Sequence, residues 1–243
     1  MRKTIAFTLG AALLGILQAG PAAAAPPITS SEFATLCSSG PLTVAGRMTV
    51  TGGTGELTAD CFITMRPGAV LTFENATLTS DTEMLIVADS QIKSALNVTG
   101  STIDLGGAVQ LATGCCAGGG EPGRNENRTS VSVIDSVIIG ETVEVSGSIA
   151  ANLGTALVQN STLEATSSSS FSLSVLASVA GTGGSATVTN STLSTPGGIH
   201  IETGTAGTTT ATGNTFSAGS VTISAGSGGT CTSAGNTPSV SCT

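Results

Sequence analysis

The sequence predicts an all-β fold, a single-chain parallel β-helix (solenoid) with coils of about 22 to 25 residues. Three observations predict it. Apolar and polar residues alternate in short stretches such as AVLTFENATL (69–78) and SATVTNSTL (185–193), which is the period of a strand with one buried face. Polar bends separate these stretches at a period in the low twenties, and the repeat lacks helical periodicity. Such a coil buries its apolar face only by stacking on its neighbours.

The first 24 residues precede the repeat and have the pattern of a secretory signal peptide. Arg2 and Lys3 are followed by an apolar stretch from Ile5 to Leu17, which is too short to span a bilayer, and by the small residues GPAAAA. Cleavage is expected after Ala24. The mature chain should therefore be exported to the medium or the cell surface, with the periplasm as an alternative, and should have no membrane span.

A short N-terminal cap is expected over residues 25–40. Thr29 and Glu32 have the spacing of a capping box, and Ile28 and Phe33 have that of a hydrophobic staple. These signals predict a helix over residues 30–37. The helix would plug the first coil of the solenoid, where open strand edges invite pairing with other chains.

The bends of the repeat, which covers residues 41–243, share one pattern. Three positions before each core residue stands an Asn, Asp or Gly, the residues that best tolerate the left-handed αL conformation. The bend residues are Asn75, Asp89, Gly100, Asp135, Asn160, Asn190, Gly213 and Gly235, and the core residues are Leu78, Ile92, Ile103, Ile138, Leu163, Leu193, Phe216 and Pro238. Some bends match the N-x-S/T glycosylation pattern, but the exchange of Asn for Asp and Gly favours a structural repeat. The αL requirement predicts that Asn190→Val destabilises far more than Ser191→Ala.

One insertion and three cysteine pairs mark the repeat. The insertion, TGCCAGGGEPGRNENRTS at about residues 113–130, is the segment least like the repeat, and loops on a rigid scaffold often bind ligands. The candidate recognition loop therefore comprises Cys115, Cys116, Glu121, Arg124 and Arg128. Disulfides are expected in an exported chain, with Cys231 and Cys242 closing the C-terminal end and Cys37 and Cys61 stapling the N-terminal one. Whether Cys115 and Cys116 join each other stays open.

The net charge of the chain disfavours nucleic acid and acidic membranes as partners, and its motifs predict no cofactor. Lys and Arg total 7 against 15 Asp and Glu, for a formal net charge of −8, so nucleic acid and acidic membranes are poor partners. The chain has no C-x-x-C motif, and no metal or cofactor is expected. The single histidine, His200, alternates outward with Glu202 in GGIHIETG. A solvated strand face explains this pair better than an acid/base pair or a weak metal site.

The strand-bend repeat and the Asn-rich turns resemble those of right-handed parallel β-helix proteins, the group that contains pectate-lyase-like enzymes, phage tailspikes and autotransporter passengers. The resemblance covers residues from about 41 to 243 and implies the architecture. Enzymes of this group place carboxylates and a basic residue on one strand face. Here the basic residues are scattered, and the candidate carboxylates are Asp81, Glu83, Asp89 and Asp104. Trp and Tyr are both absent, which disfavours a sugar-binding groove.

These observations favour a non-enzymatic, exported β-helix with a structural, adhesive or binding role. Its partner would be a polysaccharide or another cell-surface component, and self-association is possible. A polysaccharide lyase or hydrolase of the same fold is the alternative. Ice or crystal-surface binding is a weaker alternative. In its favour, five threonines before the core column could form an outward row: Thr77, Thr102, Thr162, Thr192 and Thr215. Against it, the regular T-x-T pattern is found in this row only at Thr77 and Thr79.

Overall fold

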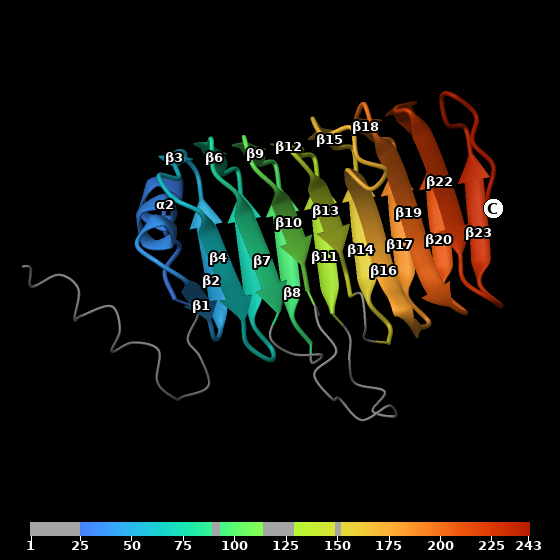
Figure 1. The fold of residues 1–243 in the computed structure, drawn as a ribbon. Coiled ribbons are helices and arrows are strands. Elements are labelled where there is room, and N and C mark those ends of the chain that lie inside the picture. Colours follow the sequence, from blue (N-terminus) through green and yellow to red (C-terminus); the bar gives the residue numbers. More distant parts are fainter. Residues whose placement is uncertain (1–24, 89–92, 114–128, 149–151) are drawn as a thin grey trace, which may run out of the picture.

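The computed structural model describes residues 25–88, 93–113, 129–148 and 152–243, and it confirms the all-β parallel solenoid (Figure 1). Three parallel sheets of eight, eight and seven strands run along the molecule, and each coil except the last contributes one strand to each sheet. Strands that follow one another in a sheet are three elements apart in the chain, which is the pattern of a coil stacked on a coil. The helix α2 lies at one end in Figure 1, and β22 and β23 lie at the other.

Sheets A, B and C are named here by their strands. Sheet B consists of β1 (Leu42–Val44), β4 (Cys61–Met65), β7 (Met84–Ala88), β10 (Val109–Ala112), β13 (Val143–Ser146), β16 (Leu173–Thr182), β19 (Gly198–Thr205) and β22 (Ser220–Ala225). Sheet A consists of β2 (Arg47–Thr51), β5 (Val70–Glu74), β8 (Ala95–Thr99), β11 (Ser130–Ile134), β14 (Thr155–Gln159), β17 (Ser185–Thr189), β20 (Thr208–Thr212) and β23 (Thr230–Ala234). Sheet C consists of β3 (Thr54–Glu56), β6 (Thr77–Ser80), β9 (Thr102–Leu105), β12 (Val137–Gly140), β15 (Thr162–Ala165), β18 (Thr192–Ser194) and β21 (Thr215–Ser217).

The bend between sheets A and C has the backbone conformation that the sequence predicts. The four described Asn and Asp residues of this bend have φ between 50° and 52°, and the glycines have φ between 57° and 67°. Gly52, with φ 62°, opens the column one coil earlier than the sequence pattern shows. Asp89 lies outside the described residues.

The core column follows each bend on sheet C. Leu78, Ile103, Ile138, Leu163 and Leu193 are fully buried and face one another in register, and Phe216 ends the row at 4% exposure. Ile92 lies outside the described residues, and the prediction of Pro238 as a core residue is wrong, because its side chain is exposed. In the coil that precedes Leu78, the equivalent position is occupied by Gly55, where a Cβ atom would lie 2.1 Å from the carbonyl oxygen of Ser30. Glycine is required there because the capping helix occupies the space of the side chain.

A second buried column, of hydroxyl and amide side chains, runs beside the bends. The residue after each bend points inward, and its side-chain oxygen accepts a hydrogen bond from the equivalent backbone N–H of the preceding coil. These bonds of 2.9 to 3.1 Å join Ala76 to Ser101, Ser101 to Ser136, Ser136 to Ser161, Ser161 to Ser191, Ser191 to Asn214 and Asn214 to Asn236. The ladder therefore satisfies backbone donors that the αL bend turns away from the sheets.

The ladder corrects the expected ranking of two substitutions at one bend. The Oγ atom of Ser191 donates to the carbonyl oxygen of Thr189 at 2.8 Å and accepts from the N–H of Ser161, and the residue is 3% exposed. Ser191→Ala leaves the N–H of Ser161 without a partner in the interior, at about 2 kcal/mol, while the carbonyl oxygen of Thr189 still accepts from the N–H of Asn160. Asn190→Val forces a β-branched residue into αL geometry, at about 1 to 2 kcal/mol. We therefore expect similar melting shifts for the two variants in parallel thermal unfolding, and a much larger shift for Asn190→Val would contradict the ladder.

The N-terminal cap forms as predicted, with α2 (Ser30–Ser38) one residue longer than expected. The capping box is complete, because Glu32 N–H donates to Thr29 and the Glu32 carboxylate accepts from the backbone N–H of Thr29. These bonds lower the pKa of Glu32. Phe33 is fully buried, edge-on to Phe73 with ring centroids 5.1 Å apart.

Disulfides lie at both ends of the described solenoid. Cys37 of α2 is joined to Cys61 of β4, and Cys231 of β23 to Cys242. Past Cys242, the backbone N–H of Thr243 donates to the carbonyl oxygen of Ile223 at 3.0 Å, so the tail covers the edge of β22. None of the helices in the described ranges has the length and apolarity needed to cross a bilayer.

Candidate functional site

The five residues of the predicted recognition loop, from Cys115 to Arg128, lie between β10 and β11 outside the described residues. Their role stays a prediction. The described residues offer three other places to consider, which are the outer face of sheet A, the outer face of sheet B and a hollow beside α2.

The outer face of sheet A is a grid of short hydroxyl side chains at its C-terminal end. Alternation buries every second residue of each strand and turns the others outward. The outward residues of the last three strands are Ser185, Thr187 and Thr189 on β17, Thr208, Thr210 and Thr212 on β20, and Thr230, Thr232 and Ala234 on β23. All except Ala234 carry a hydroxyl group. We call these nine residues the hydroxyl face.

The register of the strands makes the hydroxyl face regular in two directions. Thr187, Thr210 and Thr232 stand opposite one another on successive strands, and their neighbours two residues away do the same. Strands in a sheet lie about 4.8 Å apart, and outward residues of one strand lie about 6.6 Å apart. The rows therefore repeat at roughly these two spacings, on a backbone held by continuous parallel pairing.

The hydroxyl groups of this face are free to bind an external partner. Within the described chain, none of the outward Ser and Thr side chains of β17, β20 and β23 makes a hydrogen bond. The contrast is with the earlier part of sheet A, where Ser132 donates to Asn97 at 2.9 Å and Asn97 approaches Thr72. There the polar groups partly satisfy one another.

Charge is distributed unevenly along the solenoid. After Glu164, the only ionisable side chains are His200 and Glu202, and both lie on β19 of sheet B. The outward positions of sheet A carry charge only at Arg47 and Glu74, near the N-terminal end. The hydroxyl face is therefore uncharged, as are its surroundings on sheet C.

The bend pattern of the sequence does not reveal this face. The row of Thr77, Thr102, Thr162, Thr192 and Thr215 does form on sheet C, interrupted by Val137. The T-x-T ranks lie instead on the strands before the bend, as TVT at Thr187 to Thr189, TTTAT at Thr208 to Thr212 and TCT at Thr230 to Thr232. Alignment on those strands would have found the pattern.

The outer face of sheet B carries the ionisable groups of this half of the molecule. Glu144, Ser174 and His200 stand in register on β13, β16 and β19. The His200 ring stacks on the exposed ring of Phe171 with centroids 4.2 Å apart, and its Nε2 atom lies 2.9 Å from the carbonyl oxygen of Ser170. His200 therefore has contacts beyond the solvated face expected from the sequence.

Glu144 is the least satisfied carboxyl of sheet B. One oxygen accepts from the amide of Gln110 at 3.1 Å, while the other is buried without a partner. Burial raises the pKa of Glu144, and the hydrogen bond from Gln110 partly offsets this rise. A raised pKa is typical of a general acid.

Among the described residues, no second carboxylate is hydrogen-bonded to Glu144. Glu202 lies two strands away and two residues along, at roughly 12 Å between Cα atoms by strand geometry. Of the carboxylates expected from the sequence, Asp81 and Glu83 lie at the turn before β7 and Asp104 lies on sheet C, while Asp89 lies outside the described residues. No group of three or more His, Cys, Asp or Glu side chains in the described ranges could hold a metal ion.

Replacing Glu144 by glutamine should stabilise the protein at neutral pH. A carboxyl whose pKa is raised on folding binds its proton more tightly in the folded state, so stability is gained as the pH falls through the folded pKa and is lower above it. We expect Glu144→Gln to add about 1 kcal/mol at about pH 7 and little at about pH 4. Urea unfolding at both pH values measures this, with Glu164→Gln as the control for loss of one charge. A gain confined to the acidic pH would contradict the assignment.

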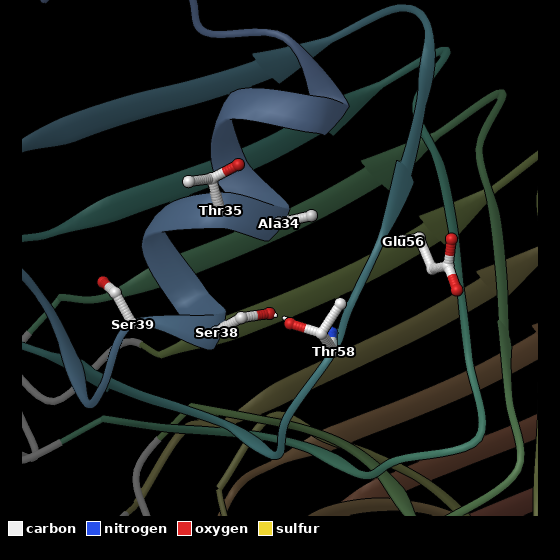
Figure 2. Close-up of a pocket in the computed structure, with 6 residues that line it drawn as sticks. All are labelled: Ala34, Thr35, Ser38, Ser39, Glu56 and Thr58. Carbon is white, nitrogen blue, oxygen red and sulfur yellow. Dashed lines mark hydrogen bonds between the residues drawn. The ribbon is translucent and has the colours of Figure 1, made fainter.

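A small hollow of about 290 Å³ lies between α2 and β3 (Figure 2). It is lined by Ala34, Thr35, Ser38, Ser39, Glu56 and Thr58, and Ser38 accepts a hydrogen bond from the backbone N–H of Thr58 across it. Ligand pockets are usually at least this large and mainly apolar. This hollow is smaller than most ligand pockets and has no large apolar side chain in its lining, so it is a poor ligand site.

Comparison of the chain with protein-family models, with curated proteins and with solved structures found no match. The resemblance to parallel β-helix proteins rests on the architecture alone.

Proposed function

We propose that this protein is an exported, non-enzymatic surface-binding protein that adheres through the outer face of sheet A. The observation that carries the proposal is the hydroxyl face, an uncharged and regular grid of unpaired hydroxyl groups. A repeating face offers many weak and equivalent contacts. It suits a partner that repeats in the same way, such as an extended polymer or a crystal surface, more than a single small ligand.

Rigidity supports the same function. Preorganised binding groups lose less entropy when they bind, and sites on strands are held more accurately than sites on loops. Threonine adds to this because its β-branched side chain has restricted χ1 rotamers. The internal ladder and the disulfide at Cys231 hold the strands that carry the face.

Export is the part of the proposal that rests on the N-terminal sequence and the cysteines. The signal pattern of residues 1–24 predicts secretion, and disulfides persist in oxidising compartments. An extracellular or cell-surface location places the face where it meets a polysaccharide or another solid surface.

Placing one charge on the hydroxyl face should weaken adhesion strongly. Thr210 lies at the centre of the face, so Thr210→Lys brings a hydrated ammonium group into the contact and should weaken adsorption about tenfold or more. The matched control is Thr192→Lys, the same change on sheet C. Depletion of the purified protein from solution by crystalline cellulose, chitin, silica and ice measures adsorption. Equal loss in both variants, or no adsorption by the parent to any solid, would refute the proposal.

A polysaccharide-acting enzyme is the second candidate, and the raised pKa of Glu144 is the observation in its favour. Incubation with neutral and acidic polysaccharides would release reducing or unsaturated ends if it were correct. Glu144→Gln should then remove the activity. The separation of Glu144 from Glu202 makes the binding function the better supported of the two.

A further inference from the structure

We propose that the surface bound by the hydroxyl face is ordered water, that is, the surface of an ice crystal. This inference rests on the proposed function, because it names the partner of the same face. It follows from the chemistry of the face, from the partners that this chemistry excludes and from the placement of the free hydroxyl groups.

Each threonine of the face offers two groups that suit a water lattice. Its hydroxyl donates one hydrogen bond and accepts two, so it can take the place of a water molecule in a hydrogen-bonded network. Its methyl group restricts the orientation of first-shell water, which favours an ordered layer beside it. The two groups share one Cβ atom with restricted rotamers, and the central row of Thr187, Thr210 and Thr232 consists of threonine alone.

Polysaccharides and ionic minerals, the other solid partners that the proposed function allows, fit the hydroxyl face less well than ice. Sugar rings are usually held by stacking on aromatic side chains, and the outward positions of sheet A in the described ranges carry no aromatic residue. Ionic minerals need complementary charge, and the hydroxyl face has none. An uncharged crystal built from small hydrogen-bonding molecules is the partner that remains.

The position of the face along the solenoid agrees with this partner. Toward the N-terminal end, Leu157, Ile134 and Val70 interrupt the outward hydroxyl groups, and Arg47 and Glu74 add charge. Such groups would break the match with a lattice. The hydroxyl face, with Ala234 at one corner, spans roughly 10 Å across the strands and 13 Å along them. A patch of this size should bind weakly, and we therefore expect slowed recrystallisation of ice more than a large depression of the freezing point.

The test compares ice growth in the presence of four chains, each with its disulfides intact. The parent protein should give faceted crystals and slow the coarsening of small ice grains. Thr210→Lys should need about tenfold or more protein for the same slowing, while Thr192→Lys should act like the parent. Thr210→Val keeps the methyl group and the rotamer restriction without the hydroxyl, and should give an intermediate effect. Thermal unfolding of each variant shows that it is folded.

Three outcomes decide the inference. Slowing by the parent and Thr192→Lys, with loss in Thr210→Lys, supports it. Unchanged round crystals with the parent, while Thr210→Lys still abolishes adsorption to cellulose or chitin, overturns the ice assignment and leaves the proposed function standing. Absence of both ice shaping and adsorption to any solid overturns both.

Discussion

Replacing Asn214 by alanine should lower the free energy of unfolding by about 3 kcal/mol, the largest effect we expect from a single polar side chain. Its amide donates to the carbonyl oxygen of Val188 at 2.9 Å and to Asn236 at 3.1 Å, and its carbonyl oxygen accepts from the N–H of Ser191 at 2.9 Å. The residue is 1% exposed, so water cannot replace these partners. The backbone N–H of Ser191 would be left unsatisfied in the interior, and the amide bonds to Val188 and Asn236 would be lost with it.

A matched variant separates the ladder from the general loss of an amide. Asn97→Ala removes the same side chain from the outer face of sheet A, where water replaces its partners, and should change stability by no more than about 0.5 kcal/mol. Asn214→Ser should recover part of the loss, because serine fills the same position in four earlier coils. Chemical unfolding measures all three, and equal shifts for Asn214→Ala and Asn97→Ala would show that the ladder does not stabilise the fold.

Removing the C-terminal disulfide should have an effect of similar size but confined to one end. Cys231 and Cys242 are 11 residues apart, and a loop of this length restricts the unfolded chain by about 3 kcal/mol on the entropy model. The last coil stacks on one neighbour only. Cys231→Ser combined with Cys242→Ser should therefore let β23 and the tail fray while the central coils stay folded.

Limited proteolysis measures the fraying directly. We expect new cleavage sites after about residue 225 in the double variant, and unchanged protection of the central coils. Loss of adsorption should accompany the fraying, because β23 carries one row of the hydroxyl face. Cleavage spread evenly along the chain would mean that the disulfide stabilises the whole solenoid.

The sequence predicts the fold well because the strongest constraints on this chain are local. An αL bend admits few residues, so Asn75, Asn160 and Asn190 identify the corners, and strand alternation identifies the buried faces. The capping box at Thr29 is equally local. Each of these signals lies within a few residues, and it needs no knowledge of what stacks on it.

The candidate site depends on the stacking of coils, which the bend pattern alone does not reveal. The serine after each bend is a polar residue with a buried side chain, and only the stacked coils show that it bonds to the next coil. The threonines of the hydroxyl face come from three separate coils, and their alignment depends on register between strands. Gly55 stands where the core column has leucine because of α2, a contact between segments that the repeat pattern does not include.

The ladder also allows whole coils to be duplicated or deleted during evolution. Each joint is the same bond, from a backbone N–H of one coil to a Ser or Asn side chain of the next, whichever two coils meet. An in-frame duplication or deletion of one coil by unequal recombination would leave intact joints on both sides. A lineage can therefore lengthen its adhesive surface in steps of about 4.8 Å, and selection can act on the number of coils as well as on their side chains.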